Sequence, residues 1–206
     1  MGIASLPLEI QLILVPTILF ALTFHEYAHA RVAYLFGDYT SYYQNRMNLN
    51  PFNHLDPFGT FALYFLGFGW AKPVPVAMQN LKNPRSDMMM IAMAGPASNM
   101  FLACLASIIY RLNFYFQLSE EVIFPLEIFI QINIVLAVFN LLPINPLDGS
   151  RILPLIVKNP KTLYNIELYG PRILIGLIIL NLIGIPILST IILTPVSIIF
   201  YLLTGA

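Results

Sequence analysis

The stretch His25-Glu26-Tyr27-Ala28-His29 follows eighteen residues, 7–24, of which only Glu9 is charged. Two histidines four positions apart lie one turn from each other on the same side of an α-helix, so both imidazoles can bind a single metal ion. The glutamate between them can reach a water molecule on that metal. The stretch therefore indicates zinc-dependent hydrolysis at the edge of a membrane-spanning helix.

The composition of the whole chain indicates an integral membrane protein in a lipid bilayer. Of its 206 residues, 58% are hydrophobic and 10% are charged, and the mean hydropathy is +0.78. An ordinary soluble domain carries about 25% charged residues. The formal net charge of zero gives no reason to expect a nucleic-acid partner. Because Cys104 is the single cysteine, an internal disulfide and a cysteine-ligated zinc site are excluded.

The apolar stretches predict an all-α polytopic membrane protein with about five to six membrane segments around a three-helix catalytic core. We expect the first helix over residues 8–36 and the third over 122–142. The second should cover 86–112, with Ser86 as a candidate N-cap. The apolar region 164–203 predicts two further segments, because it is interrupted by Gly184-Ile185-Pro186.

The connection between the first and second spans has a different pattern. Residues 39–57 are rich in Tyr, Asn and Pro, a composition typical of turns at the aqueous interface. The aromatic segment 58–71 is shorter than the ~20 residues of a spanning helix, so we expect an interfacial or re-entrant piece. The prolines of Lys72-Pro73-Val74-Pro75-Val76 exclude a helix, and such extended backbone must line a cavity or pair with another segment.

The chain contains neither an internal repeat nor a linker-like segment. We therefore predict a single membrane-embedded metalloprotease domain over residues 1–206. Its catalytic core should cover about 8–157, and the accessory C-terminal membrane segments about 164–204.

The basic residues predict the orientation of the spans. Nine of the ten flank the first-to-second and third-to-fourth connections, and only Arg111 lies beside the connection between the second and third spans. Since basic connections face the cytoplasm, the histidine pair and Asp148 should share the cytoplasmic side and a similar depth. We expect a multi-pass protein of the cell membrane, with its active site toward the cytoplasm.

A catalytic zinc usually binds three protein ligands and leaves its fourth position for water. His25 and His29 supply two, and His54 is the only other histidine. Among the carboxylates, Asp148 alone lies in a broken, proline-flanked element at matching depth. An ionisable residue near hydrocarbon costs about 2.5 to 3.5 kcal/mol, and metal ligation gives a reason to retain it. We predict Asp148 as the third ligand and one Zn²⁺ per chain.

Both motifs also have structural explanations. Two histidines can line a polar helix interface without a metal, and an aspartate before Gly149 can serve a turn. Their occurrence together, at one side of the membrane, favours the metal site.

These residues resemble a known family. HEYAH in a membrane helix, followed far along the chain by Asn140-Leu-Leu-Pro-Ile-Asn-Pro-Leu-Asp148-Gly, is similar to the site-2 proteases, which are intramembrane zinc proteases, in their compact form without a PDZ or CBS domain. Asn145 departs from the family pattern before Pro146. The resemblance covers roughly residues 20 to 157 and includes Gly37-Asp38, Asn50-Pro51, His54-Leu-Asp56-Pro57-Phe-Gly59-Thr60, Gly69-Trp-Ala-Lys72-Pro-Val-Pro-Val76 and Ala94-Gly95-Pro96-Ala97-Ser98-Asn99.

The resemblance implies zinc ligation by His25, His29 and Asp148 and a general-base role for Glu26, in agreement with the prediction from the residues. The oxyanion formed during hydrolysis needs a donor besides the metal. Asn140, two turns before Asp148, is the candidate, and an interhelical hydrogen bond is its alternative role.

His54 and the extended segment 70–76 each have an interpretation of their own. His54 lies in the predicted turn His54-Leu-Asp-Pro57, where a histidine usually has a structural role at an interface. The resemblance, however, implies that it lies near the active site. The extended segment 70–76 prompts the hypothesis that it pairs with a substrate strand, because a peptide bond within a helix is not open to attack.

We therefore predict an intramembrane zinc endopeptidase that cleaves transmembrane segments of other membrane proteins, as in regulated intramembrane proteolysis. A membrane protease for soluble or interfacial substrates, like the prenyl-protein proteases, would need a glutamate on a later helix as third ligand, and Glu127 and Glu167 are poor candidates by depth. A non-proteolytic metal-binding or metal-transport protein is the other alternative, but it would not need Glu26 between its ligands.

Overall fold

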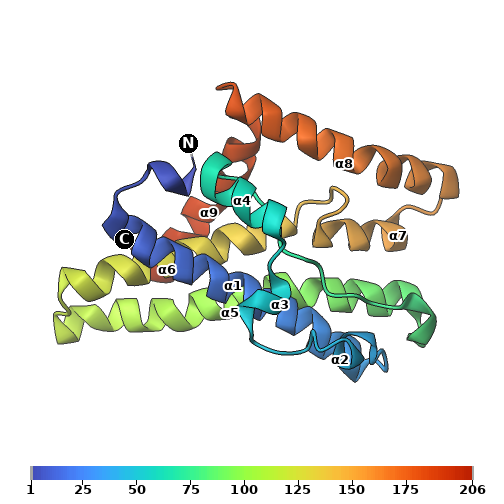
Figure 1. The fold of residues 1–206 in the computed structure, drawn as a ribbon, viewed down its shortest axis with the longest axis horizontal. Coiled ribbons are helices and arrows are strands. Elements are labelled where there is room, and N and C mark those ends of the chain that lie inside the picture. The colour runs from blue at the N-terminus through green and yellow to red at the C-terminus, as the bar shows by residue number, and fades with distance from the viewer. Residues whose placement is uncertain (1, 206) are drawn as a thin grey trace.

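The computed structural model describes residues 2–205, and five of its helices are long and apolar enough to cross a membrane. This architecture confirms the predicted all-α polytopic fold class (Figure 1). The five helices are α1 (Leu8–Leu35), α5 (Pro84–Phe116), α6 (Glu120–Asn140), α8 (Pro160–Leu182) and α9 (Ile187–Thr204).

Short helices occupy the ends and connections of these spans. Within residues 2–205 the only β-type pairing is an isolated antiparallel bridge between Leu55 and Ala71. The short elements are η1 (Ile3–Ser5), α2 (Thr40–Tyr43), α3 (Pro51–His54), α4 (Pro57–Leu66), η2 (Met78–Asn80), η3 (Asp148–Ile152) and α7 (Leu153–Ile156).

Helices α1, α5 and α6 form the core of the molecule (Figure 1). Helices α5 and α6 form an antiparallel hairpin, and α1 packs against both. Small residues on one stripe of α5 permit this close approach. All four residues of that stripe, Ala92, Gly95, Asn99 and Ala103, are buried.

The start of α5 corrects one prediction. The helix begins at Pro84, and its N-cap residue is Asn83, not Ser86. Proline suits a first helical position because its fixed φ is helical and its missing N–H has no partner there. The Ser86 hydroxyl instead donates to the Asn83 carbonyl (3.2 Å), and the Asp87 carboxylate accepts from the Asn83 N–H (2.8 Å).

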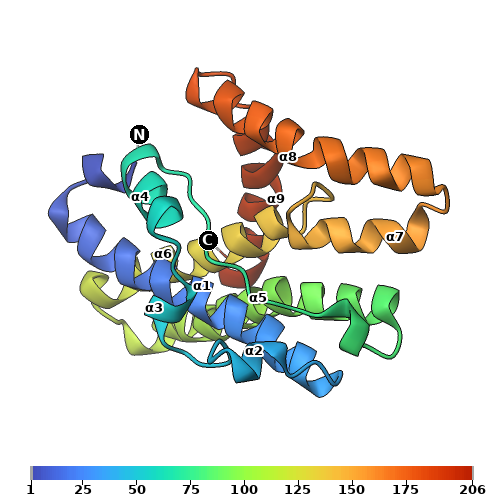
Figure 2. The ribbon, with the colours of Figure 1, turned by 45° about the vertical axis from the view of Figure 1, so that its right-hand side comes forward.

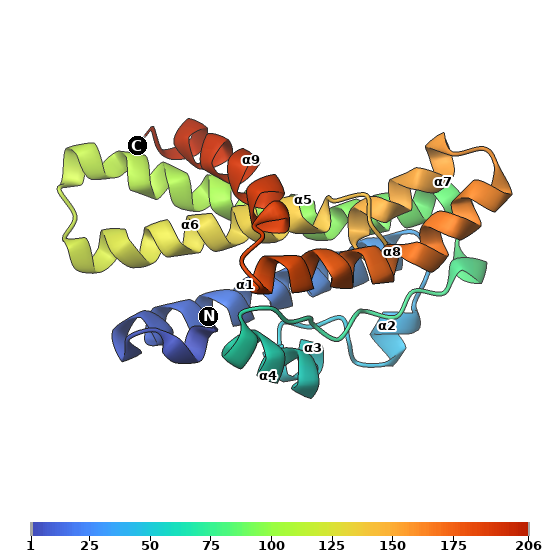
Figure 3. The same ribbon diagram turned by 90° about the horizontal axis from the view of Figure 1, so that it is seen from above.

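The connection between α1 and α5 folds against the side of α1 that faces away from α5 and α6 (Figure 3). Helix α4 is too short to span a membrane, as the segment length predicts, and ends at Gly67, where φ is 78°. The chain then returns in extended form and forms the bridge to Leu55. We call residues 71–77 of this return the strap.

The C-terminal helices pack unequally. Helix α9 lies against α5 and α6, where Val196 contributes to an apolar cluster with Ala103, Ala106, Ile130 and Ile134. Helix α8 extends away from the α1–α5 pair (Figure 2). Helix α8 approaches the turn before η3 at Gly170. A Cβ on Gly170 would lie only 2.8 Å from the Asn145 Cβ.

Candidate metal centre

The first part of the site lies within α1. The helical repeat places His25 and His29 one turn apart, and both side chains are buried, with 3% and 8% of their surface exposed. Glu26 lies next to His25 on the same helix and is 8% exposed. A single local element therefore orients all three side chains.

The second part follows α6. After a turn over residues 141–147, Asp148 begins η3. The turn is tight because Gly149 lies directly against the main chain that precedes it. A Cβ on Gly149 would lie 2.2 Å from the carbonyl oxygen of Leu141, so a side chain at this position would force the turn open. The close approach returns Asp148 toward α1.

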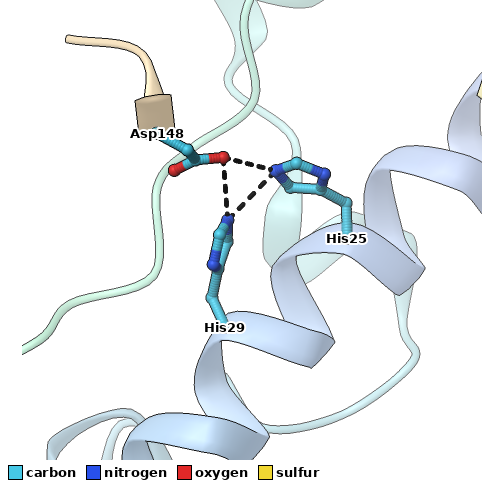
Figure 4. A group of neighbouring side chains, drawn as sticks. All are labelled: His25, His29 and Asp148. Carbon is cyan, nitrogen blue, oxygen red and sulfur yellow. Dashed lines mark hydrogen bonds and ion pairs between the residues drawn. The ribbon is translucent and has the colours of Figure 1, made fainter. Parts of the chain in front are cut away.

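Asp148 and the two histidines form a compact triangle in which both rings and the carboxylate point toward one another (Figure 4). The His25 and His29 Nε2 atoms lie 3.0 Å apart. Asp148 Oδ2 lies 3.1 Å from His25 Nε2 and 3.3 Å from His29 Nε2. Ligand atoms at 2.0–2.2 Å from a tetrahedral zinc are separated by about 3.3 Å or slightly more. The three separations are close to that spacing.

The hydrogen bonds on the far side of each ring determine which nitrogen carries the proton. His25 Nδ1 lies 2.6 Å from Asn99 Oδ1, and His29 Nδ1 lies 2.7 Å from the Ile91 carbonyl oxygen. Both partners are acceptors, so each Nδ1 carries the hydrogen and each neutral ring presents its Nε2 lone pair to the triangle. This is the arrangement in which metal-ligating histidines are usually held.

The charge of the triangle also fits a cation. In this tautomer an ionised Asp148 carboxylate faces two lone-pair nitrogens, so the centre of the triangle is rich in electron pairs. One added proton satisfies one pair of these atoms, whereas a divalent cation at the centre contacts all three. The donor set therefore fits zinc.

Helix α5 closes the side of the triangle nearest the rings. A Cβ on Gly95 would lie 2.4 Å from the Nε2 atoms of both His25 and His29. Glycine is therefore required here by space and not by backbone conformation. The small-residue stripe has a role in the site as well as in helix packing.

Glu26 contacts the strap. Its Oε2 accepts a hydrogen bond from the Val74 N–H (3.0 Å). The structure thus places the predicted general base beside the histidines and in contact with the Pro-Val-Pro-Val segment.

The structure places Asn140 and His54 outside the triangle. Asn140 ends α6, and its Nδ2 donates to the Leu136 carbonyl of the same helix (3.0 Å). His54 is buried in α3, where its Nε2 bonds the Asn48 carbonyl (2.8 Å) and its carbonyl accepts from the Lys72 N–H (2.8 Å). The main chain of His54 thereby supports the strap, and the oxyanion role of Asn140 stays a prediction.

Sequence reasoning missed the residues that hold the ligands from behind. Asn99 also donates to the Ala21 carbonyl (3.2 Å) and to Asn133 Oδ1 (2.9 Å), so it connects α1, α5 and α6. The available signal was a polar asparagine on the small-residue stripe of an otherwise apolar span. Arg46, which contacts the strap, gave no comparable signal.

The comparisons with known proteins agree with this chemistry. A family model described as peptidase family M50 matches residues 115–180. A Bacillus subtilis (strain 168) protein named "Putative zinc metalloprotease YwhC" is 44% identical over 153 residues, which cover 71% of this chain and 70% of that protein. No solved structure matches the chain significantly.

Proposed function

The chain belongs to peptidase family M50, and from that premise we propose that it is an intramembrane zinc endopeptidase that cleaves transmembrane segments of other membrane proteins. Its membership confirms the family expected from the motifs. The observation that carries the proposal is the His25–His29–Asp148 triangle, whose two histidines are buried among apolar helices with Glu26 beside them.

His25, His29 and Asp148 would hold one zinc ion, through the two Nε2 atoms and the Asp148 carboxylate. When bound, zinc supplies a Lewis acid that makes water more acidic and polarises a peptide carbonyl. The hydrogen bonds of the two Nδ1 atoms with Asn99 and Ile91 favour the ring tautomer that leaves both Nε2 atoms available to the metal.

Glu26 would act as the general base and then as the general acid. A carboxylate has two oxygens, and the Val74 N–H occupies a lone pair on Oε2 only. Oε1 can therefore accept a proton from water, and the protonated carboxyl can later donate it to the leaving amine. Asn140 Nδ2 carries a second N–H besides the one given to Leu136, and this hydrogen could stabilise the oxyanion.

The strap would hold the substrate in an extended conformation. Hydrogen bonds within a helix shield its peptide bonds, so a transmembrane substrate must unwind locally before attack. An unwound strand could pair with the extended main chain of the strap, next to Glu26. Replacing residues 73–76 with a flexible linker should then abolish cleavage while zinc remains bound.

The catalytic end of the bundle would face the cytoplasm. His25 and His29 lie in the second half of α1, and Asp148 follows the end of α6. The basic connections lie at the same ends of these helices, and such connections remain on the cytoplasmic side.

The substitution Glu26→Gln tests the proposal. The purified variant should retain zinc but lose cleavage of a single-span membrane substrate, because Gln cannot accept the proton. Glu9→Gln is a matched control, since Glu9 is exposed at the start of the same helix. Normal cleavage by zinc-loaded Glu26→Gln would refute the mechanism, and failure of the wild-type protein to bind zinc would refute the metal site.

A further inference from the structure

The strap is held to the rest of the protein along its length. Hydrogen bonds to four other parts of the chain constrain the position of the strap. The attachments are Lys72 N with His54 O, the Lys72 and Pro73 carbonyls with Arg46, Val74 N with Glu26, and Ala77 N with Asp38.

Arg46 is unusual among these partners. Its side chain is buried, with 7% of the residue exposed, and no carboxylate lies within ion-pair distance of it in residues 2–205. Its Nη2 donates to the Lys72 carbonyl (2.7 Å) and to the Pro73 carbonyl (3.3 Å). Burying a guanidinium against main-chain carbonyls is costly, so its position calls for an explanation beyond loop packing.

The Pro73 carbonyl and the Val74 N–H belong to the same peptide unit. In a planar trans peptide these two groups point in opposite directions. Arg46 therefore bonds one side of this unit, and Glu26 accepts a bond from the other side (3.0 Å). A donor on the carbonyl polarises the peptide and strengthens the hydrogen bond made by its N–H.

The flanking prolines make this connection stiff. Pro73 has a fixed φ angle, and Pro75 restricts the residue before it, Val74, to an extended conformation, so the main chain around this peptide unit has few alternatives. The charge of Glu26 also reaches Arg46. Burial lowers the pKa of the Arg46 guanidinium, and the negative charge of Glu26 opposes that change.

We propose that Arg46 is a positioning residue for Glu26, which it orients through the peptide unit that joins Pro73 to Val74. The inference rests on the proposed role of Glu26 as the base. It predicts that Arg46 influences the chemical step without contacting either the substrate or the metal ligands.

Two substitutions of Arg46 test the proposal in the full-length, zinc-loaded protein. Arg46→Met keeps the length of the side chain but removes its donors, and Arg46→Lys restores one charged donor. Arg46→Met should lower kcat by roughly ten- to hundredfold, with KM changed less than about threefold, and Arg46→Lys should recover part of the loss. Arg85→Met, at an exposed position in the first turn of α5, is the matched control.

A second pair of variants isolates the peptide unit itself. Val74→Pro removes the N–H, whereas Val74→Ala keeps it and removes only the outer part of the side chain. Val74→Pro should reproduce the kcat loss of Arg46→Met, and its kcat should fall below that of Val74→Ala, which measures the effect of the shortened side chain alone. The double variant Arg46→Met with Val74→Pro should be no worse than either single variant, because both break the same connection.

Hydrogen exchange and zinc content supply readouts besides activity. Arg46→Met should accelerate amide exchange over the strap and leave zinc content unchanged. Additive losses in the double variant, a change in KM alone, or full kcat in Val74→Pro would overturn the proposal. If Glu26→Gln remained active, the proposed base would be wrong, whereas an inactive Glu26→Gln beside a fully active Arg46→Met would refute only the role of Arg46.

Discussion

Helix α5 and the strap approach the site from different sides and hold it by different means. Helix α5 contacts the backs of both histidine rings through Asn99 and the Ile91 carbonyl, and these groups belong to a buried helix within the three-helix core. The strap contacts Glu26 through one main-chain N–H in an extended segment. The difference indicates that the core rigidly holds the two candidate histidine ligands, whereas the strap, which is proposed to receive the substrate, holds the proposed base.

This contrast implies two classes of variant. Changes on the α5 side should alter metal affinity, and changes on the strap side should leave zinc bound while altering activity or local stability. The Arg46 and Glu26 variants belong to the second class.

The largest effect is expected for Gly95→Ala. Its Cβ would lie 2.4 Å from both Nε2 atoms, so the histidines or α5 must move. Zinc affinity should fall at least about 100-fold. This loss exceeds the roughly 10- to 100-fold that is typical when a hydrogen-bond partner of a metal ligand is replaced. Gly176→Ala is the control, because a Cβ there meets nothing within 4 Å. Competition with a chelator would measure the affinity, and a stoichiometric zinc complex of unchanged affinity would contradict the close approach.

Asn99→Leu should have an intermediate effect. It removes the acceptor for His25 Nδ1 and leaves Asn133 without its Asn99 partner, in a region from which water is excluded. We expect zinc affinity to fall about 10- to 100-fold, with activity recovering at high zinc concentration. Ser98→Ala is a neighbouring control, since its hydroxyl bonds only its own helix at Gly95. An Asn99→Leu protein with normal affinity and low activity would break the proposed division between the two sides.

The smallest effect is expected for Asp38→Asn at the end of the strap. Burial raises the pKa of Asp38, but hydrogen bonds from Thr40, Asn80 and the Ala77 N–H outweigh it and lower that pKa. The resulting stability is present above the unfolded pKa of ~3.9 and is lost as pH falls through the lower folded pKa. Near neutral pH, Asp38→Asn should destabilise the protein by about 1 to 3 kcal/mol.

Thermal unfolding in detergent at several pH values would measure this difference. The wild-type advantage should be constant at neutral pH and shrink only under strongly acidic conditions. Zinc content should remain normal, since Asp38 lies on the strap side. An advantage that increased as pH fell would contradict the direction of the pKa shift.

The spans and the histidine pair could be predicted because their signals are local. The apolar run before His25 predicts α1 to within one residue at its end, and helical periodicity alone brings His25 and His29 to one face. Asp148 required an argument from depth, and its contact with both histidines agrees with that argument. The N-cap of α5 was assigned wrongly because Asn83-Pro84 and Ser86-Asp87 both resemble helix starts.

The sequence by itself determined the membrane setting, the helical order and the identity of the three candidate ligands with Glu26. Composition, periodicity and donor chemistry depend on residues close together or on residue type alone. Only the tertiary structure decided that Asn99 holds His25, that Ile91 holds His29 and that Val74 holds Glu26. These pairs are separated by 74, 62 and 48 positions, and no local pattern encodes which helix faces or main-chain groups will meet when the spans pack.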